Sequence, residues 1–197
     1  MKIFPYICNN IQFQTLSIMA NNNPTKVITG KVRFSYAHVF EPVPVSEGSE
    51  DKKYSVSIII SKDDKATLKK IENAIEAAKQ AGAAKWGGKI PKNLKLPLRD
   101  GDLEREEECY ANAYFLSAKT SQKPGIVDEN LDEIISKDEF YSGCYGRASI
   151  NFFPFDTNGS KGIACGLYNL QKLEDGERLG GSYASAAEDF GDDDDLS

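Results

Sequence analysis

The sequence predicts a mainly β fold, an OB-fold-like five-stranded barrel with one helix. Several stretches of about ten residues alternate apolar and polar side chains, as half-buried strands do. A single long stretch has the 3.6-residue periodicity of a helix, and long connections rich in charge, Gly and Pro separate these elements. On pattern alone, other small β-barrels and α+β sheets remain alternatives. A long basic loop and a disordered acidic C-terminal tail complete the expectation.

The first two strands are predicted at residues 31–37 and 53–60, where polar and apolar side chains alternate strictly. Pro42, Pro44 and Gly48 mark a loop at 41–52 between them. One face of their sheet is expected to be wet, because the alternation leaves one side of each strand polar. The side chains expected to face the core are Val32, Phe34, Tyr36, Tyr54, Val56, Ile58 and Ile60.

A helix is predicted at 63–81, because apolar residues recur there at helical spacing. Asp63 and Asp64 suit its N-terminus, and Gly82 is expected to end it. The segment 86–99 that follows is expected to be a long basic loop.

Three further strands are predicted at 109–119, 145–153 and 162–172. The last two are joined by the hairpin-type turn at 156–159, which contains Asn158 and Gly159.

Charge is distributed unevenly along the chain. The 197 residues include 24 Lys and Arg against 30 Asp and Glu, and six of these acids lie in the last ten residues. Since 30 − 6 leaves 24 acids against 24 bases, the net charge of −6 belongs to the tail. Such a run of like charge is typical of a disordered interaction arm. We therefore expect an N-terminal extension at 1–24, with 1–18 upstream of a second start at Met19, an OB-fold domain at 25–183 and an acidic tail at 184–197.

The residues give little support to an enzyme, a metal centre or a membrane protein. The four cysteines are far apart in the sequence, and His38 is the one histidine, so the clustered ligands of a zinc site are missing. No apolar run approaches the roughly 18 residues of a membrane span. The acids of 100–108 could form a metal-dependent nuclease site, although acid clusters in loops are usually solvated. We expect no cofactor, no metal and no catalytic residue.

A nucleic-acid interface has more support. Single strands are bound by basic grooves that follow the phosphates and by aromatic faces on which bases stack. In the strand at 145–153, alternation places rings, a guanidinium and amides on one face, a mixture that a core would not tolerate. The predicted stacking residues are Tyr110, Tyr114, Tyr145 and Phe153. The predicted phosphate contacts are Lys31, Arg33, Lys53, Lys89, Lys92, Lys95, Lys119 and Arg147.

Several long motifs in order add a family resemblance. The segments 97–102, 140–153, 161–172 and 175–181 resemble a family of tailed-bacteriophage OB-fold single-stranded-DNA-binding proteins, once known only as a phage domain of unknown function. The resemblance spans about residues 25–190 and includes the acidic tail. It implies the fold, single-stranded DNA as ligand and a setting in phage DNA replication, recombination or repair, within the cytoplasm of the infected bacterium. It supplies no list of contact residues.

We therefore expect a protein that binds single-stranded DNA with little sequence preference. The tail, through Asp192, Asp193, Asp194, Asp195 and Leu196, is expected to compete with DNA and to recruit phage or host replication and recombination proteins. A homodimer is left open. The alternatives are a phage structural or accessory protein that uses the tail for docking and, with less support, a metal-dependent nuclease.

Overall fold

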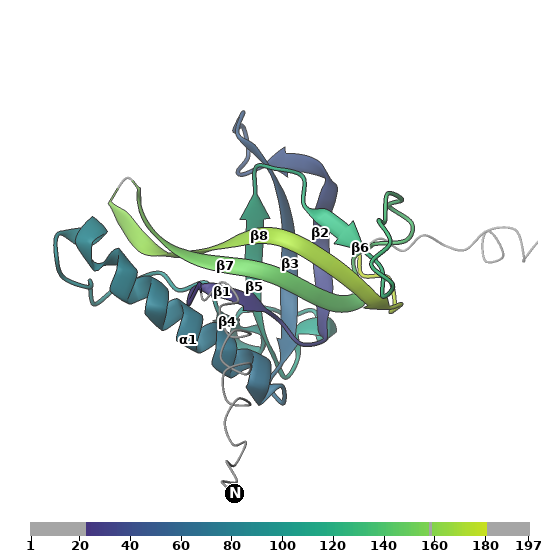
Figure 1. Ribbon diagram of the computed structural model, residues 1–197, viewed down its shortest axis with the longest axis horizontal. Helices are drawn as coiled ribbons and strands as arrows, with labels where there is room; N and C mark the ends of the chain where they lie inside the picture. Colours follow the sequence, from purple (N-terminus) through teal and green to yellow (C-terminus); the bar gives the residue numbers. More distant parts are fainter. Residues whose placement is uncertain (1–22, 158, 181–197) are drawn as a thin grey trace, which may run out of the picture.

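A computed structural model describes residues 23–157 and 159–180 (Figure 1). It contains one long helix and a sheet of eight strands, five of which form the body. The helical elements are α1 (Lys65–Gly82), α2 (Gly101–Glu104) and the 3₁₀ turns η1 (Ala83–Trp86) and η2 (Glu108–Tyr110). The strands are β1 (Lys26–Ile28), β2 (Val32–Pro44), β3 (Lys52–Ser61), β4 (Arg99–Asp100), β5 (Ala113–Thr120), β6 (Gly125–Val127), β7 (Tyr145–Thr157) and β8 (Ser160–Glu174).

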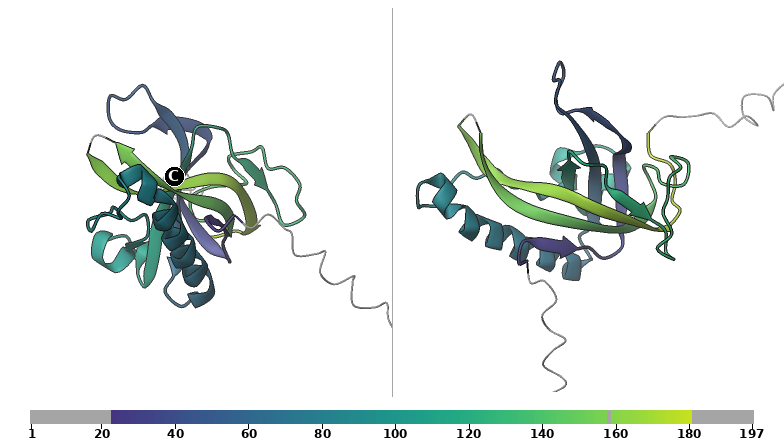
Figure 2. Two further views of the ribbon diagram at one scale, coloured as in Figure 1. Left: turned by 60° about the vertical axis from the view of Figure 1, so that its left-hand side comes forward. Right: turned by 45° about the horizontal axis from the view of Figure 1, so that its top comes forward.

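The strand pairings close a ring in the order β7–β2–β3–β5–β8–β7, which confirms the prediction of an OB-fold-like body with five main strands. Two of the strand pairings in this ring are short, because β2 pairs with β7, and β5 with β8, over two residue pairs each. The ring is therefore only loosely closed. The long β7–β8 hairpin runs across β2, β3 and β5, and α1 lies along the side of the hairpin (Figures 1 and 2).

Helix α1 confirms the predicted helix with shifted ends. Asp64 caps it by accepting a hydrogen bond from the Thr67 amide. The α-helix ends at Gly82 as predicted, and the chain continues directly into the 3₁₀ turn η1, which ends at Gly87, where φ is 81°. The continuation lets Trp86 bury its ring and donate its indole N–H to the Phe155 carbonyl at 3.0 Å, which ties α1 to β7.

A bulge in β2 overturns the expectation that Tyr36 faces the core. Tyr36 has φ 46° and is 50% exposed, while Ser35 is buried. From Ser35 to His38 the strand advances three residues while β3 advances two, from Ser57 to Ser55. The extra residue turns Tyr36 outward. Strand β2 also runs on to Pro44, so the predicted loop at 41–52 is shorter than expected.

Strand β5 begins at Ala113 rather than at Cys109, and this corrects the prediction for Tyr110. Tyr110 lies in η2, is 0% exposed and donates its hydroxyl to Ser57 Oγ at 3.2 Å. It packs with Ile59, Ala113 and Phe115 in a second, smaller core on the outer side of β3 and β5. The segment 99–112 therefore covers part of the sheet face that the alternation predicted to be wet.

The predicted extension at 1–24 and tail at 184–197 lie almost wholly outside the described residues, so the domain boundaries stay a prediction. Among residues 23–157 and 159–180, no helix has both the length and the apolar character needed to cross a bilayer.

Candidate nucleic-acid interface

Two adjoining hollows form one continuous groove on the outer face of the body. They share Thr120, Leu167 and Tyr168, which join them into a single depression. We call this depression the groove. The larger hollow has a volume of about 720 Å³, enough for more than one group of the size of a nucleobase. It is lined by side chains from β3, β5, β7 and β8, and the smaller one by β8 and the segments around β1 and β6.

Strand alternation explains why the groove has this position. In β7 the residues Ala148, Ile150 and Phe152 are at most 1% exposed, so Asn151 and Phe153, which alternate with them, face outward, as predicted. In β8 the buried residues are Ile163, Cys165 and Leu167, which turns Ala164 and Gly166 outward. Small outward residues on β8 beside large ones on β7 leave a hollow along β8.

Two exposed aromatic rings line the groove. Phe153 of β7 is 44% exposed, and Tyr168 of β8 is 46% exposed. Lys26 of β1 lies over the Tyr168 ring, 5.4 Å from its centroid. Both rings can accept a stacked base, because each presents a solvent-facing π surface.

The groove is strongly biased toward positive charge. Five cationic side chains line it, and none of the described residues that line it is an Asp or Glu. This bias is notable in a chain that holds more acids than bases. Lys53 is paired with Asp51 at 3.3 Å and Arg99 with Glu104, whereas the other three have no ion pair within the described ranges. The five are Lys26, Lys53, Arg99, Lys119 and Lys123.

Three predicted residues lie together outside the groove. Tyr145, Lys31 and Arg33 line a separate hollow, and both cations are 5.4 Å from the Tyr145 ring centroid. Lys31 pairs with Glu174, and Arg33 donates to the carbonyls of Gly143 and Glu177 at 3.2 and 3.1 Å. Their charges are thus partly engaged by the protein itself.

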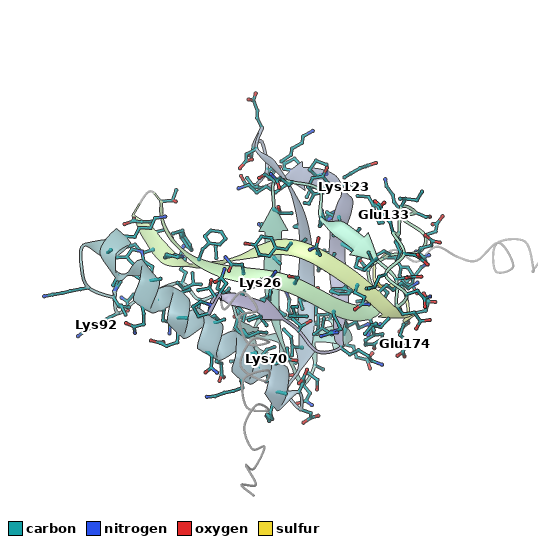
Figure 3. All side chains as sticks on the ribbon, viewed as in Figure 1. Lys26, Lys70, Lys92, Lys123, Glu133 and Glu174 are labelled. Atoms are coloured by element: carbon teal, nitrogen blue, oxygen red, sulfur yellow. The ribbon has the colours of Figure 1, made fainter. Side chains whose placement is uncertain are left out.

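The remaining predicted cations are dispersed. Arg147 is exposed on β7 and donates Nε to the Thr29 carbonyl at 3.2 Å. Lys89, Lys92 and Lys95 are exposed on the segment between η1 and β4, and none of them lines the groove. Figure 3 shows Lys92 beyond the end of α1, far from Lys26 and Lys123. Lys53 and Lys119 are the two predicted phosphate contacts that the fold brings into the groove.

The predicted stacking residues separate in the same way. Phe153 is in the groove and Tyr145 in the other hollow. The prediction for Tyr110 is wrong, because a fully buried ring offers no face to a base. Tyr114 is half-buried against the main core, with Lys62 5.0 Å from its ring centroid. The tail residues Asp192–Leu196 lie outside the described residues.

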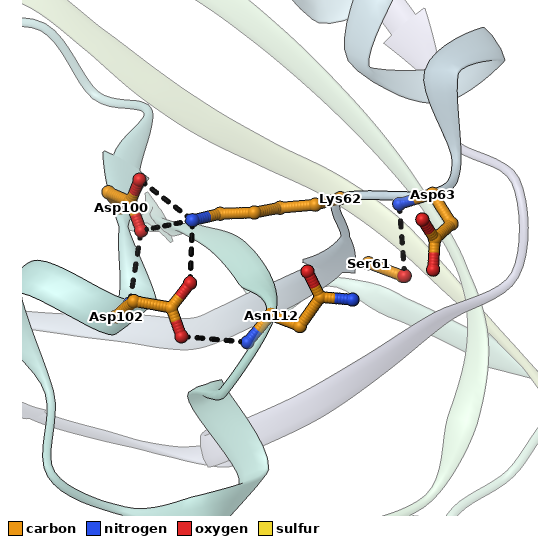
Figure 4. Close-up of polar contacts among 6 residues, drawn as sticks. All are labelled: Ser61, Lys62, Asp63, Asp100, Asp102 and Asn112. Carbon is orange, nitrogen blue, oxygen red and sulfur yellow. Dashed lines mark hydrogen bonds and ion pairs between the residues drawn. The ribbon is translucent and has the colours of Figure 1, made fainter.

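The acidic segment 100–108 forms ion pairs within the protein. Lys62 Nζ lies 2.7 Å from Asp100 Oδ1 and 2.6 Å from Asp102 Oδ2 (Figure 4). Asp102 also accepts the Asn112 amide at 2.8 Å, and the Lys62 contact, then this amide, lower the pKa of its carboxyl group. The two carboxylates raise the pKa of Lys62. Within the described part of the chain, no three His, Cys, Asp or Glu side chains cluster as metal ligands.

The pattern missed four groove residues, namely Lys26, Arg99, Lys123 and Tyr168. Lys26 belongs to a strand of only three residues, too short for alternation to show. Tyr168 is the extra residue at a register shift in the β7–β8 ladder, between Leu167 and Asn169, so the pairing with the neighbouring strand does not place it. The run Ala164, Gly166, Tyr168 between apolar residues carried a usable signal, since alternation puts all three on one face.

Comparison with known proteins gives consistent matches. Protein p50 of Acyrthosiphon pisum secondary endosymbiont phage 1 is 32% identical over 177 residues, which cover 85% of this chain and 93% of that protein. A solved structure of the single-stranded DNA-binding protein from bacteriophage Enc34, in complex with ssDNA, is similar with a TM-score of 0.70 and 26% identity. It covers 80% of this chain and 91% of its own.

A more distant structure, gp2.5 of bacteriophage T7, has a TM-score of 0.57 at 13% identity, over 80% of this chain and 90% of that one, and supports the fold alone. The model of the family described as "Enterobacter phage Enc34, ssDNA-binding protein" matches residues 25–197. The chain therefore belongs to this family of phage single-stranded DNA-binding proteins.

Proposed function

We propose that this protein binds single-stranded DNA in the groove, with little sequence preference and without catalysing a reaction. The observation that carries the proposal is the pairing of five cations and two exposed rings in a depression lined by no carboxylate among the described residues. Cations hold the phosphates of a single strand, and rings stack on bases of any identity.

The family supports both parts of this proposal. The Enc34 protein was solved in complex with ssDNA, and the family is described by its binding to ssDNA rather than by a reaction. The ion-paired acids of the 100–108 segment fit this view, since Asp100 and Asp102 are held by Lys62.

The setting is the host cell of a phage, in its cytoplasm, during replication, recombination or repair of phage DNA. The six acids of the C-terminal ten residues are opposite in charge to the groove and compete with DNA for it. Displaced by DNA, the segment ending in Leu196 recruits replication or recombination proteins of phage or host. These roles rest on charge complementarity and on the family.

The test is a fluorescence anisotropy titration with labelled oligo-dT across a salt series. The wild type is compared with a Lys53→Glu, Lys119→Glu double variant. Each phosphate contact on a single strand contributes about −0.7 to the log–log salt slope, so the variant should bind more weakly and with a shallower slope. A Lys69→Glu, Lys70→Glu double variant is the matched control, because it makes the same change in charge at two exposed residues of α1 outside the groove (Figure 3 labels Lys70).

The outcomes separate the candidate functions. Equal loss in the control would show a general charge effect rather than a site. Absence of binding by the wild type would favour an accessory role through the tail. Cleavage of the oligonucleotide on addition of Mg²⁺ would favour a nuclease.

A further inference from the structure

Gly166 of β8 lines the larger hollow of the groove. It faces Asn151 across the β7–β8 ladder and Lys119 across the β5–β8 pairing. Asn151 in turn faces Lys26 of β1, so one lateral row crosses four strands. With neighbouring strands about 4.8 Å apart, the two lysines lie roughly 14 Å from one another along the sheet. Gly166 is the position in this row that has no side chain.

No backbone atom requires a glycine there, and the Phe153 ring is the neighbour that an added Cβ would press against. A Cβ at Gly146 or Gly162 would lie 1.9 or 2.4 Å from a backbone carbonyl oxygen, so those two glycines are dictated by packing. At Gly166 the nearest atom would be Cε1 of the Phe153 side chain at 3.3 Å, and φ lies outside the left-handed region. Glycine inside a strand costs backbone entropy and lowers β propensity. Neither close backbone contact nor backbone geometry explains its presence.

The surroundings of Gly166 fit a flat ligand. The Phe153 ring stands diagonally beside it, because Phe153 faces Ala164, two residues away on β8. Lys119 borders it on the other side and has no ion pair among the described residues. A base stacks on an aromatic ring, and its phosphate is held by a cation. Phe153 and Lys119 supply these two groups on either side of the Gly166 peptide, which carries no side chain.

We propose that Gly166 is the seat of a nucleobase, which lies over the bare backbone and stacks on Phe153 while its phosphate contacts Lys119. This inference rests on the proposed function and assigns one base to one position in the groove. Gly166 acts as a specificity-determining residue for ligands that carry planar bases, because a side chain there presses on the Phe153 ring and fills the space beside it that the base needs.

The experiment compares Gly166→Val and Gly166→Ala with wild type, using oligo-dT and an oligonucleotide of the same length made of abasic sites. Loss of one stacked base should weaken oligo-dT binding of the valine variant by about 5- to 150-fold. Binding of the abasic strand should not change, because it has no base to exclude. The salt slope should also be retained, since no charge is removed. The alanine variant, with its smaller side chain, should show a smaller loss on oligo-dT alone.

Ser149→Val is the control, because Ser149 also faces outward in the sheet but does not line the groove. It should bind both strands like wild type. Equal loss on oligo-dT and abasic strands, or no loss on either with Gly166→Val, would overturn the inference. If Gly166→Val fails to fold, Gly166→Ala decides by the same criterion. Weaker binding by the Lys53→Glu, Lys119→Glu variant together with unchanged Gly166 variants would leave the proposed function intact and reject the seat alone.

Discussion

The ammonium of Lys26 lies 5.4 Å from the centroid of the Tyr168 ring, although their strands, β1 and β8, are separated in the sheet by β7. The lysine therefore reaches across one strand and covers part of the ring, while 46% of Tyr168 stays exposed. A cation placed beside an open ring can hold a phosphate next to a stacked base. Tyr168 lines both hollows and Lys26 lines the smaller one, so this pair stands where the two hollows of the groove meet.

Replacing Tyr168 with alanine should weaken binding of oligo-dT by about 5- to 150-fold, the range expected for one stacked base. The salt slope should change little, because stacking releases no counterion. Tyr168→Phe should bind like wild type, since it keeps the ring. Anisotropy titrations at several salt concentrations measure both quantities, and a normal affinity for Tyr168→Ala would show that DNA does not reach this end of the groove.

Tyr110→Phe provides the opposite pattern. The substitution removes the hydroxyl that donates to Ser57 Oγ in the smaller core. We expect a loss of about 0.5–1.5 kcal/mol in the free energy of unfolding, measured in urea, with unchanged DNA affinity. A clear drop in affinity with unchanged stability would mean that this ring becomes accessible and acts in binding.

Tyr145 and Phe153 lie on the same strand eight residues apart, a separation of roughly 26 Å. Tyr145→Ala should therefore leave the affinity for a short oligo-dT unchanged, whereas Phe153→Ala should lower it. The titrations are then repeated with oligo-dT of increasing length. A strand long enough to reach both hollows should gain a contribution from Tyr145. Equal effects of the two substitutions on the shortest oligonucleotide that binds would contradict the assignment of the site to the groove.

The sequence predicts which face a side chain occupies only where a strand alternates regularly. The outward face of β7 was predictable, since Gly146, Ala148, Ile150 and Phe152 alternate without interruption. The outward position of Tyr36 was not predictable, because a single extra residue between Ser35 and His38 reverses the faces of the residues that follow it in β2. The prediction that Tyr110 stacks on a base was wrong for a different reason. The chain enters β5 through a 3₁₀ turn that folds back on the sheet.

The site also depended on contacts that no local pattern contains. Lys119 and Phe153 come together only through the parallel pairing of β5 with β8 and the antiparallel pairing of β7 with β8. The residues that alternation placed on outward faces were largely outward, but which outward faces meet is decided by strand order. For this reason Lys31, Arg33 and Tyr145 resembled Lys53, Lys119 and Phe153 in sequence and yet line another hollow.

The ion pairs of Lys62 predict a pH dependence of stability. The folded protein lowers the pKa of Asp102, mainly through its hydrogen bond with Lys62. A carboxyl group whose pKa is depressed on folding stabilises the protein above its unfolded pKa of about 3.9, and this contribution is lost as the pH falls through the folded pKa. Asp102→Asn should therefore be less stable than wild type near neutral pH, and the difference should shrink below about pH 4.

Urea unfolding of both proteins between pH 7 and the acid limit of folding measures this difference. Incubation of both proteins with single-stranded DNA and Mg²⁺ tests the nuclease alternative, since we expect neither protein to cleave the DNA. A stability difference that is constant with pH would show that the Lys62 contact is not what stabilises Asp102.

The acidic tail should make the groove's affinity depend on salt in a second way. Truncation after Ala187 removes six acids and leaves an equal number of acids and bases in the chain. The proposed competition acts at a high effective concentration, because the acidic segment belongs to the same chain as the groove and is opposite to it in charge. The truncated protein should therefore bind oligo-dT more tightly than the full chain, with the largest gain at low salt, where charges are least screened.

Melting temperatures should be nearly equal, and recruitment of a replication partner should be lost, with Leu196→Asp giving a milder defect. Titrations of both proteins across salt provide the test, and weaker DNA binding by the truncated form at every salt concentration would show that the tail does not compete with DNA.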